Sequence, residues 1–280
     1  TYEEEYEYIK AFHDLPMFVP WEHARDDVLY VMGLAFLGVS VLFAVIYFVL
    51  QGLVKFSSPL AHRKASYVVT NLIVNFFLGW IGLYVHTQLL PKDPTYEDRI
   101  LDCKAIYWVT SLQCGYQLWA LPVGILWVEE RASMLIHHVS VLIVASLPAF
   151  FTIGWRYYTP FFFGVVELSS VPLAVMNAFK ENKEWVAKYP SQYNQVRTIF
   201  AISFLYLRWY WYMPFKYEYL RLQLFATLSS ESIAFKIYFG LAWTAALTLT
   251  ILQLFWGVLI VKGLARHYLF PSRKKKGLIT

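Results

Sequence analysis

Long stretches without Asp, Glu, Lys or Arg constrain this chain more than any other feature. Four of them, residues 28–54, 65–90, 105–128 and 237–261, contain none of these charges. About 20 residues of helix cross a hydrocarbon layer of roughly 30 Å, and a charge at its centre is costly. Each stretch is therefore long enough to cross a membrane once.

Three further stretches are apolar except for isolated ionisable or titratable residues. They are 132–155 with His137 and His138, 157–179 with Glu167, and 198–215 with Arg208. The chain is 58% hydrophobic and only 15% charged, which is too little polar surface for a water-soluble protein of this size. We predict an all-α fold, a multi-pass transmembrane helical bundle of about seven spans.

The distribution of charge divides the chain and orients it. We expect an acidic, Tyr-rich arm and interfacial segment over 1–27, the transmembrane bundle over 28–264, and a basic tail over 265–280. Lys and Arg are more frequent after the first, third and fifth stretches and in the tail than on the opposite side. The positive-inside rule then places the N-terminus outside or in a lumen and the C-terminus inside.

The net charge of +5 and the two cysteines suggest neither nucleic acid nor metal. Basic residues gather at the ends of segments, as in the run from Arg273 to Lys276, where anionic lipid headgroups explain them better. Cys103 and Cys114 match no metal-ligand spacing, and adjacent helical histidines point about 100° apart. We therefore expect no metal, no nucleic acid and no cofactor other than a bound lipid.

Polar side chains recur at helical spacing within the apolar stretches. They are Asn71 and Asn75; Thr110, Gln113 and Gln117; Ser133, His137 and Ser140; and Glu167, Ser170 and Asn177. Polar groups at membrane depth face protein or a cavity, so these stripes predict a common polar interior. For the Asn and Gln residues, hydrogen bonding between helices is an equal alternative. We expect Arg208 either to pair with Glu167 or to extend through the belt of Tyr206, Tyr210 and Tyr212.

Three ordered motifs resemble the TLC-domain family, the multi-pass membrane proteins that include ceramide synthases and lipid-handling relatives. Gly115-Tyr116, then Glu129-Glu130, then His137-His138 is similar to the family's Gly-Tyr, linker and His-His arrangement. The segment from Glu167 to Pro172 resembles its Glu-Leu-Ser-x-x-Pro element. Phe200 through Phe204 to Arg208 is similar to its Phe and Arg pattern, so a TLC-like core is expected over about 60–262.

The chain departs from this family at several positions. Ceramide synthases carry two aspartates after the paired histidines, whereas no Asp follows His138 here. An Asp common in the lipid-handling relatives falls at about Ala120, and a His common in the second span is replaced near Asn71. The resemblance therefore implies the scaffold, and acyl-CoA-dependent N-acylation is not the expected activity.

We interpret the chain as a TLC-like protein that binds a membrane lipid through Asn71, Asn75, Gln113, Gln117, His137, His138, Glu167, Ser170 and Arg208. Whether it is an enzyme stays open. One alternative is a lipid acyltransferase with His137 or His138 as base and Glu167 orienting it. Another is an accessory subunit of a large membrane complex, docked through the arm from Thr1 to Phe12. The resemblance favours an endomembrane of the ER type, with a mitochondrial or plastid inner membrane as the alternative.

Overall fold

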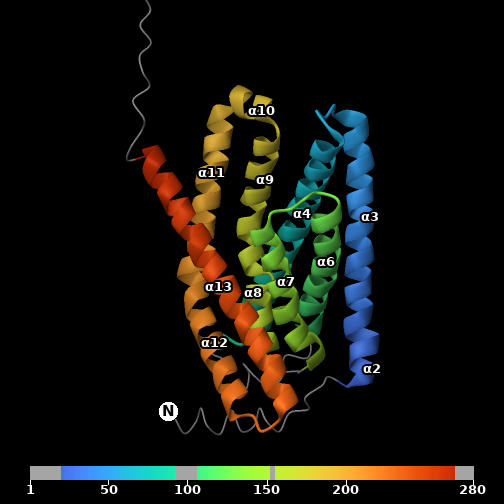
Figure 1. Ribbon diagram of the computed structural model, residues 1–280, viewed down its shortest axis with the longest axis vertical. Helices are drawn as coiled ribbons and strands as arrows, with labels where there is room; N and C mark the ends of the chain where they lie inside the picture. Colours follow the sequence, from blue (N-terminus) through green and yellow to red (C-terminus); the bar gives the residue numbers. More distant parts are fainter. Residues whose placement is uncertain (1–19, 93–105, 152–154, 269–280) are drawn as a thin grey trace, which may run out of the picture.

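The structure is a computed structural model that describes residues 20–92, 106–151 and 155–268 (Figure 1). Its long helices and their continuations are α2 Trp21–His23, η1 Ala24–Leu29 and α3 Tyr30–Leu53; α4 Pro59–Tyr84 and η2 Val85–Leu89; α6 Tyr107–Leu126; α7 Ala132–Ser146 and η4 Leu147–Phe151. They are followed by η5 Arg156–Tyr158, α8 Thr159–Phe162, η6 Val165–Ser169 and α9 Ser170–Glu181; α10 Lys183–Lys188; α11 Pro190–Leu205, η7 Tyr206–Trp211 and α12 Tyr212–Ser229; and α13 Ile233–Tyr268.

The long helices pack as a closed ring. Following the contacts around the molecule, α3 packs on α6, α6 on α7, α7 on α13, α13 on α11, α11 on α9, α9 on α4, and α4 returns to α3 (Figure 1). A ring of amphipathic helices turns one side of each helix inward and the other outward. It therefore creates an interior that lipid tails do not reach.

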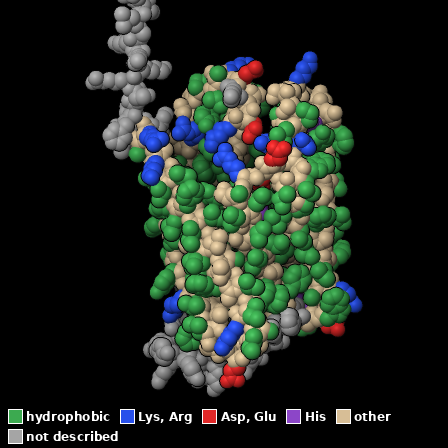
Figure 2. Space-filling model, viewed as in Figure 1, with side chains coloured by type: hydrophobic (Ala, Val, Ile, Leu, Met, Phe, Trp, Pro, Cys, Tyr) green, Lys and Arg blue, Asp and Glu red, His purple; other side chains and the backbone are tan. Residues whose placement is uncertain are grey.

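The outward side of this ring is apolar. Leu37, Val41, Val45 and Phe48 of α3 are each more than half exposed, and green apolar side chains cover the middle of the face seen in Figure 2. Lys and Arg side chains gather toward the two ends of that face (Figure 2). Exposed apolar side chains in this quantity belong in hydrocarbon, so the predicted all-α transmembrane bundle is confirmed, and the chain is an integral membrane protein.

Five helices are long and apolar enough to cross a membrane by length and composition. They cover Trp21–Leu53, Pro59–Leu89, Ala132–Phe151, Arg156–Glu181 and Ile233–Arg266. Two more helical stretches, Tyr107–Leu126 and the run from Pro190 to Ser229, lie in the same bundle at the predicted positions but are not among these five. The exact number of spans stays a prediction. The arm from Thr1 to Phe12, Cys103 and the run from Arg273 to Lys276 lie outside the described residues.

The stretch 157–179 differs from the single helix that its composition suggests. It is built from the short segments α8 and η6 before α9 begins, with a break at Gly164. A Cβ atom on Gly164 would lie 2.4 Å from the Cα of Gly82 on α4, and one on Gly82 would meet the Gly164 Cα at the same distance. Glycine at both positions thus lets the broken segment press directly against α4.

Candidate functional site

One cluster of polar side chains surrounds His138 in the ring interior. The imidazole Nδ1 lies 2.6 Å from Gln117 Oε1, and Nε2 lies 3.3 Å from Glu130 Oε2. The Tyr67 hydroxyl donates to the same Glu130 oxygen over 3.0 Å and lies 3.5 Å from Nε2. Beside this group, the Tyr116 hydroxyl donates to Asn71 Oδ1 over 3.1 Å. We call Tyr67, Asn71, Tyr116, Gln117, Glu130 and His138 the histidine cluster.

Local backbone geometry brings Glu130 to this cluster. After α6 ends, the chain reverses through Glu129 at a φ of 51°, and the Glu130 amide donates to the Gly124 carbonyl over 2.9 Å. The carboxylate folds back over the end of α6, where a Cβ on Gly124 would lie 2.8 Å from Glu130 Oε2. The absence of a side chain at Gly124 therefore makes room for the acid that faces His138.

A second cluster surrounds Arg208 on η7. Its guanidinium donates from Nε to Ser169 Oγ over 2.7 Å, and from one terminal nitrogen to Ser170 Oγ over 3.0 Å and to the Val166 carbonyl over 3.1 Å. The same nitrogen lies 3.4 Å from Glu167 Oε2, which also accepts from Ser170 Oγ over 2.7 Å. Of the two predictions for Arg208, pairing with Glu167 is confirmed. We call Val166, Glu167, Ser169, Ser170 and Arg208 the arginine cluster.

Prolines explain why the backbone is irregular at the arginine cluster. Pro172 in the first turn of α9 has no N–H to donate four residues back, and η6, a 3-10 turn, precedes that helix. The Val166 carbonyl accepts from Arg208 and also from the Ser169 hydroxyl, the latter over 2.7 Å. Pro214 likewise has no N–H for Tyr210, and η7, a π-helical turn, carries Arg208 just before it. The two irregular turns bring the Glu167 and Arg208 side chains face to face.

His137 lies between the two clusters. Its ring is 9% exposed, its centroid lies 5.7 Å from the centroids of His138 and of Trp256 on α13, and both His138 and Arg208 are within electrostatic range. Its Nδ1 has no hydrogen-bond partner among the described residues. The interior thus contains one imidazole that the protein anchors and one that it leaves without a partner at Nδ1.

Other predicted interior residues are buried, but their polar atoms are unevenly satisfied. Gln113 is fully buried, and neither its amide oxygen nor its amide nitrogen has a partner within the described part of the chain. The same holds for Thr110 Oγ1. Both residues lie one to two turns from Gln117 on the same face of α6. Asn75 of α4 is also buried.

The structure groups the predicted site residues differently from the acid–base hypothesis. Glu167, proposed there to orient a histidine, is held by Arg208 and Ser170, and the carboxylate beside His138 is that of Glu130. Sequence reasoning did not select Tyr67 or Glu130 as site residues. Glu130 lies in a connection, where a carboxylate is ordinary, although it follows Gly-Tyr within the motif. No spacing argument would single out Tyr67 among 21 tyrosines.

The histidine cluster brings an imidazole, a carboxylate and a hydroxyl into contact. The His138 ring lies against Gln117 through Nδ1 and against Glu130 through Nε2. Tyr67 supplies a hydroxyl to the same carboxylate oxygen. This is a set of groups that can bind a polar headgroup or transfer a proton, and no group of three or more metal-ligating side chains occurs in the described regions.

Comparison with known proteins identifies the family. Neither the curated proteins nor the solved structures contain a match to the chain. The family model of the TLC domain matches residues 37–262, which covers the expected core over 60–262 and starts earlier, within α3. That match spans most of the 280 residues and all of the polar side chains described above. The chain belongs to the TLC-domain family.

Proposed function

We propose that this membrane protein binds a membrane lipid in its polar interior and serves lipid homeostasis or lipid sensing. Membership of the TLC-domain family supports a lipid as the ligand class. The proposed site is the interior between the histidine cluster and the arginine cluster, with Asn75, Gln113 and His137 beside them. The headgroup is the part of the lipid that enters this interior, because the acyl chains can stay against the apolar outer side of the ring.

The observation that carries this proposal is the set of buried polar atoms without partners on α6 and α7. They are Thr110 Oγ1, both polar atoms of Gln113, and Nδ1 of His137. Each unsatisfied buried donor or acceptor costs about 1–3 kcal/mol of stability. A headgroup with hydroxyl, amide or ester groups would offset this cost by supplying the missing donors and acceptors.

The test is to replace Gln113 with methionine, which removes the unpaired amide and keeps the side chain's length. The protein is purified in mild detergent, and bound lipid is quantified by mass spectrometry. We expect Gln113→Met to lower the lipid retained per protein and to abolish the rise in melting temperature on adding that lipid back. Gln51→Met, at an exposed position at the end of α3, is the matched control and should retain lipid as the wild type does.

The opposite result would follow from a dry interior. Removing an unpaired buried amide is neutral or stabilising when nothing binds it. If Gln113→Met melts at a higher temperature and retains as much lipid as Gln51→Met, the interior binds no headgroup, and the lipid proposal is wrong.

A lipid acyltransferase is the second candidate, and the contact between His138 and Glu130 favours it. His138 lies against Gln117 through Nδ1 and 3.3 Å from the Glu130 carboxylate through Nε2, so the two kinds of side chain most used in acid–base catalysis meet in one buried place. The missing aspartates after His138 oppose N-acylation. Incubation with acyl-CoA and amine acceptors decides between the two: a product made by the wild type and not by His138→Ala supports the enzyme, and equal inactivity refutes it.

An accessory subunit of a large membrane complex is the third candidate, with the acidic arm from Thr1 to Phe12 as its docking segment. Native electrophoresis of the solubilised protein tests it. A band far above 32.8 kDa with co-purifying subunits supports this role, and a band at the mass of the chain in detergent refutes it.

For the membrane itself we propose an endomembrane of the ER type, with an organellar inner membrane as the alternative. The N-terminus is proposed to lie outside or in the lumen and the C-terminus inside, from the distribution of Lys and Arg. Protease protection of tags at the two ends in sealed vesicles tests the orientation, and digestion of an N-terminal tag from the cytosolic side would reverse it.

A further inference from the structure

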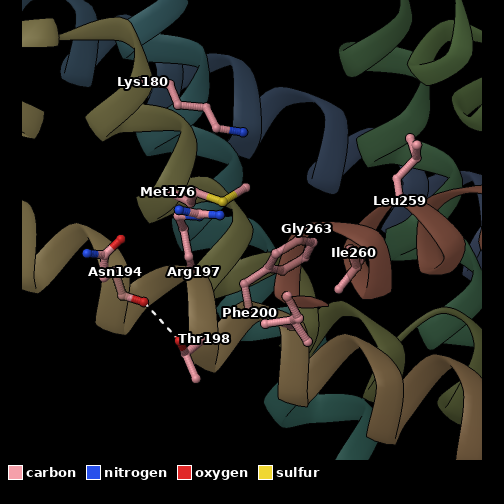
Figure 3. A pocket seen from close by; sticks show the side chains of 11 residues that line it. Met176, Lys180, Asn194, Arg197, Thr198, Phe200, Leu259, Ile260 and Gly263 are labelled. Atoms are coloured by element: carbon pink, nitrogen blue, oxygen red, sulfur yellow. Dashed lines mark hydrogen bonds between the residues drawn. The ribbon is translucent and has the colours of Figure 1, made fainter. Parts of the chain in front are cut away.

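A groove opens between α9, α11 and α13 at the end of the bundle where α9 ends, apart from both polar clusters. Its volume is about 210 Å³. Seven of its eleven lining residues are apolar or glycine, Met176, Leu259 and Ile260 among them, and the four polar ones are Lys180, Asn194, Arg197 and Thr198. Figure 3 shows Lys180 of α9 and Arg197 of α11 reaching toward a space that Leu259 and Ile260 of α13 border.

Two cations line this groove, and a third lies near one of them. Lys180 and Arg197 line it, and Arg131, at the start of α7, is within electrostatic range of Lys180, as is Arg197. Figure 2 shows Lys and Arg side chains gathered around a hollow at this end of the molecule, with Asp and Glu side chains also nearby. The positive charges of Arg131 and Arg197 therefore repel that of Lys180.

No carboxylate of a described residue forms an ion pair with these cations. Within the described ranges, the ion pairs join other residues, namely His23 with Asp27, Arg25 with Asp26, His138 with Glu130, and Arg208 with Glu167. Arg197 instead stacks over the ring of Tyr193, with 5.6 Å between the guanidinium carbon and the ring centroid. Among the described residues, no ion pair neutralises these cations, and Lys180 is within electrostatic range of the other two.

From this combination we propose that the groove binds the phosphate headgroup of an anionic membrane lipid, with its acyl chain along the apolar wall. Lys180 and Arg197 donate to the phosphate oxygens from two helices, and Arg131 adds its charge at the rim. Met176, Leu259 and Ile260 offer the surface on which a chain lies. A bare phosphate would use the cations and leave that surface unused.

This site goes beyond the interior proposed above and shares none of its residues. Phe200, which lines the groove, contacts Phe204, and Phe204 lies under the Arg208 guanidinium at 5.7 Å. The groove is thus a neighbour of the arginine cluster, and each site has its own test.

The experiment compares bound lipid on the full chain in nanodiscs of mixed phosphatidic acid and phosphatidylcholine by native mass spectrometry. The double variant Lys180→Gln/Arg197→Gln should lower the preference for phosphatidic acid by about tenfold or more, since two charge-assisted contacts are lost. The matched control, Lys55→Gln/Lys64→Gln, removes the same charge near the same end of the bundle, where α3 ends and α4 begins, and should change the preference less than about twofold.

A second variant changes no charge. A Cβ on Gly263 meets no atom within 4 Å, so Gly263→Phe fills the groove without a clash at that carbon, and Gly38→Phe is the same change at an exposed position on α3. We expect Gly263→Phe to abolish selective retention of phosphatidic acid and Gly38→Phe to leave it intact. This pair decides the question even if the double variant fails to fold.

Three results would overturn the proposal. The first is a wild type without preference for phosphatidic acid, and the second is an equal loss in the double variant and its lysine control, which would indicate general surface charge. The third is competition by inorganic phosphate that Gly263→Phe leaves unchanged, which would indicate a site for the free ion. Loss of lipid in Gln113→Met with the groove intact would concern only the interior site.

Discussion

Replacing Arg208 with methionine leaves the Glu167 carboxylate buried without its cation. Arg208 is 5% and Glu167 7% exposed, and their closest atoms lie 3.4 Å apart. Removing one partner of a buried ion pair costs about 3–5 kcal/mol, because the remaining charge is uncompensated. Glu167 keeps the 2.7 Å bond from Ser170, so we expect Arg208→Met to lower the free energy of unfolding by about 3 kcal/mol, the lower end of that range.

The converse variant, Glu167→Gln, should be milder. Arg208 would keep Ser169 Oγ, Ser170 Oγ and the Val166 carbonyl as acceptors. We expect a loss of about 1–3 kcal/mol, the usual cost of weakening a buried hydrogen-bonded group.

The double variant Arg208→Met/Glu167→Gln separates this reasoning from general damage. It leaves no buried charge at the arginine cluster, so it should be more stable than the sum of the single losses predicts, with a coupling energy of about 1–3 kcal/mol. The assay is unfolding by SDS titration in mixed micelles, followed by circular dichroism. Arg266→Met, at an exposed position of α13, should match the wild type. Additive single losses would refute the idea that Glu167 is stabilised mainly by Arg208.

Three further predictions concern other buried positions. Lys216 is 2% exposed, and its ammonium lies 5.1–5.5 Å from the ring centroids of Phe162, Tyr212 and Tyr219. Desolvating this charge costs more than these contacts return. We therefore expect Lys216→Met to keep or raise the melting temperature. Gly164→Ala should lower the melting temperature sharply, because its Cβ would meet the α4 backbone, whereas Gly38→Ala should not. Glu130→Gln should lower the melting temperature, because the carboxylate that accepts from Tyr67 and faces His138 is replaced by an amide.

Results that contradict these three predictions are equally specific. A marked destabilisation by Lys216→Met would mean that the aromatic contacts outweigh desolvation. Normal stability of Gly164→Ala would mean that α4 and the broken segment can separate without cost. Unchanged stability of Glu130→Gln would mean that the Glu130 carboxylate contributes nothing to holding Tyr67 and His138.

The helices were predictable because the length of each apolar stretch and its lack of charge indicate a membrane-spanning helix. In lipid, a run of more than 20 uncharged apolar residues such as 28–54 satisfies its backbone hydrogen bonds as a helix, and the structure has a helix there. The pairing of Arg208 with Glu167 followed from the same logic, since two lone opposite charges at membrane depth attract each other. The broken backbone of 157–179 was not predicted, because composition reports burial and not the close approach that Gly82 and Gly164 permit.

The candidate site was only half predictable, for a geometric reason. Helical spacing identifies residues that share one face of one helix, such as Gln113 and Gln117 on α6, but it does not say which helices face each other. The partners of His138 come from α4, α6 and the connection after α6, so Tyr67 and Glu130 emerge only once the ring order is known. From its place in a connection, the Glu130 carboxylate is expected to be solvated, whereas the turn at Glu129 carries it back toward the interior.

The two proposed sites contain different kinds of unpaired side-chain groups, and this difference predicts different ligand groups. In the described part of the interior, Glu130 faces His138 and Glu167 faces Arg208, whereas polar atoms of Thr110, Gln113 and His137 on α6 and α7 have no partner. At the groove the unmatched groups are the cations Lys180, Arg197 and Arg131. A neutral hydroxyl or amide headgroup therefore suits the interior, and a phosphate suits the rim. If one lipid occupied both, its affinity would respond to Gln113→Met and to Lys180→Gln/Arg197→Gln alike; two separate lipids would respond to one variant each.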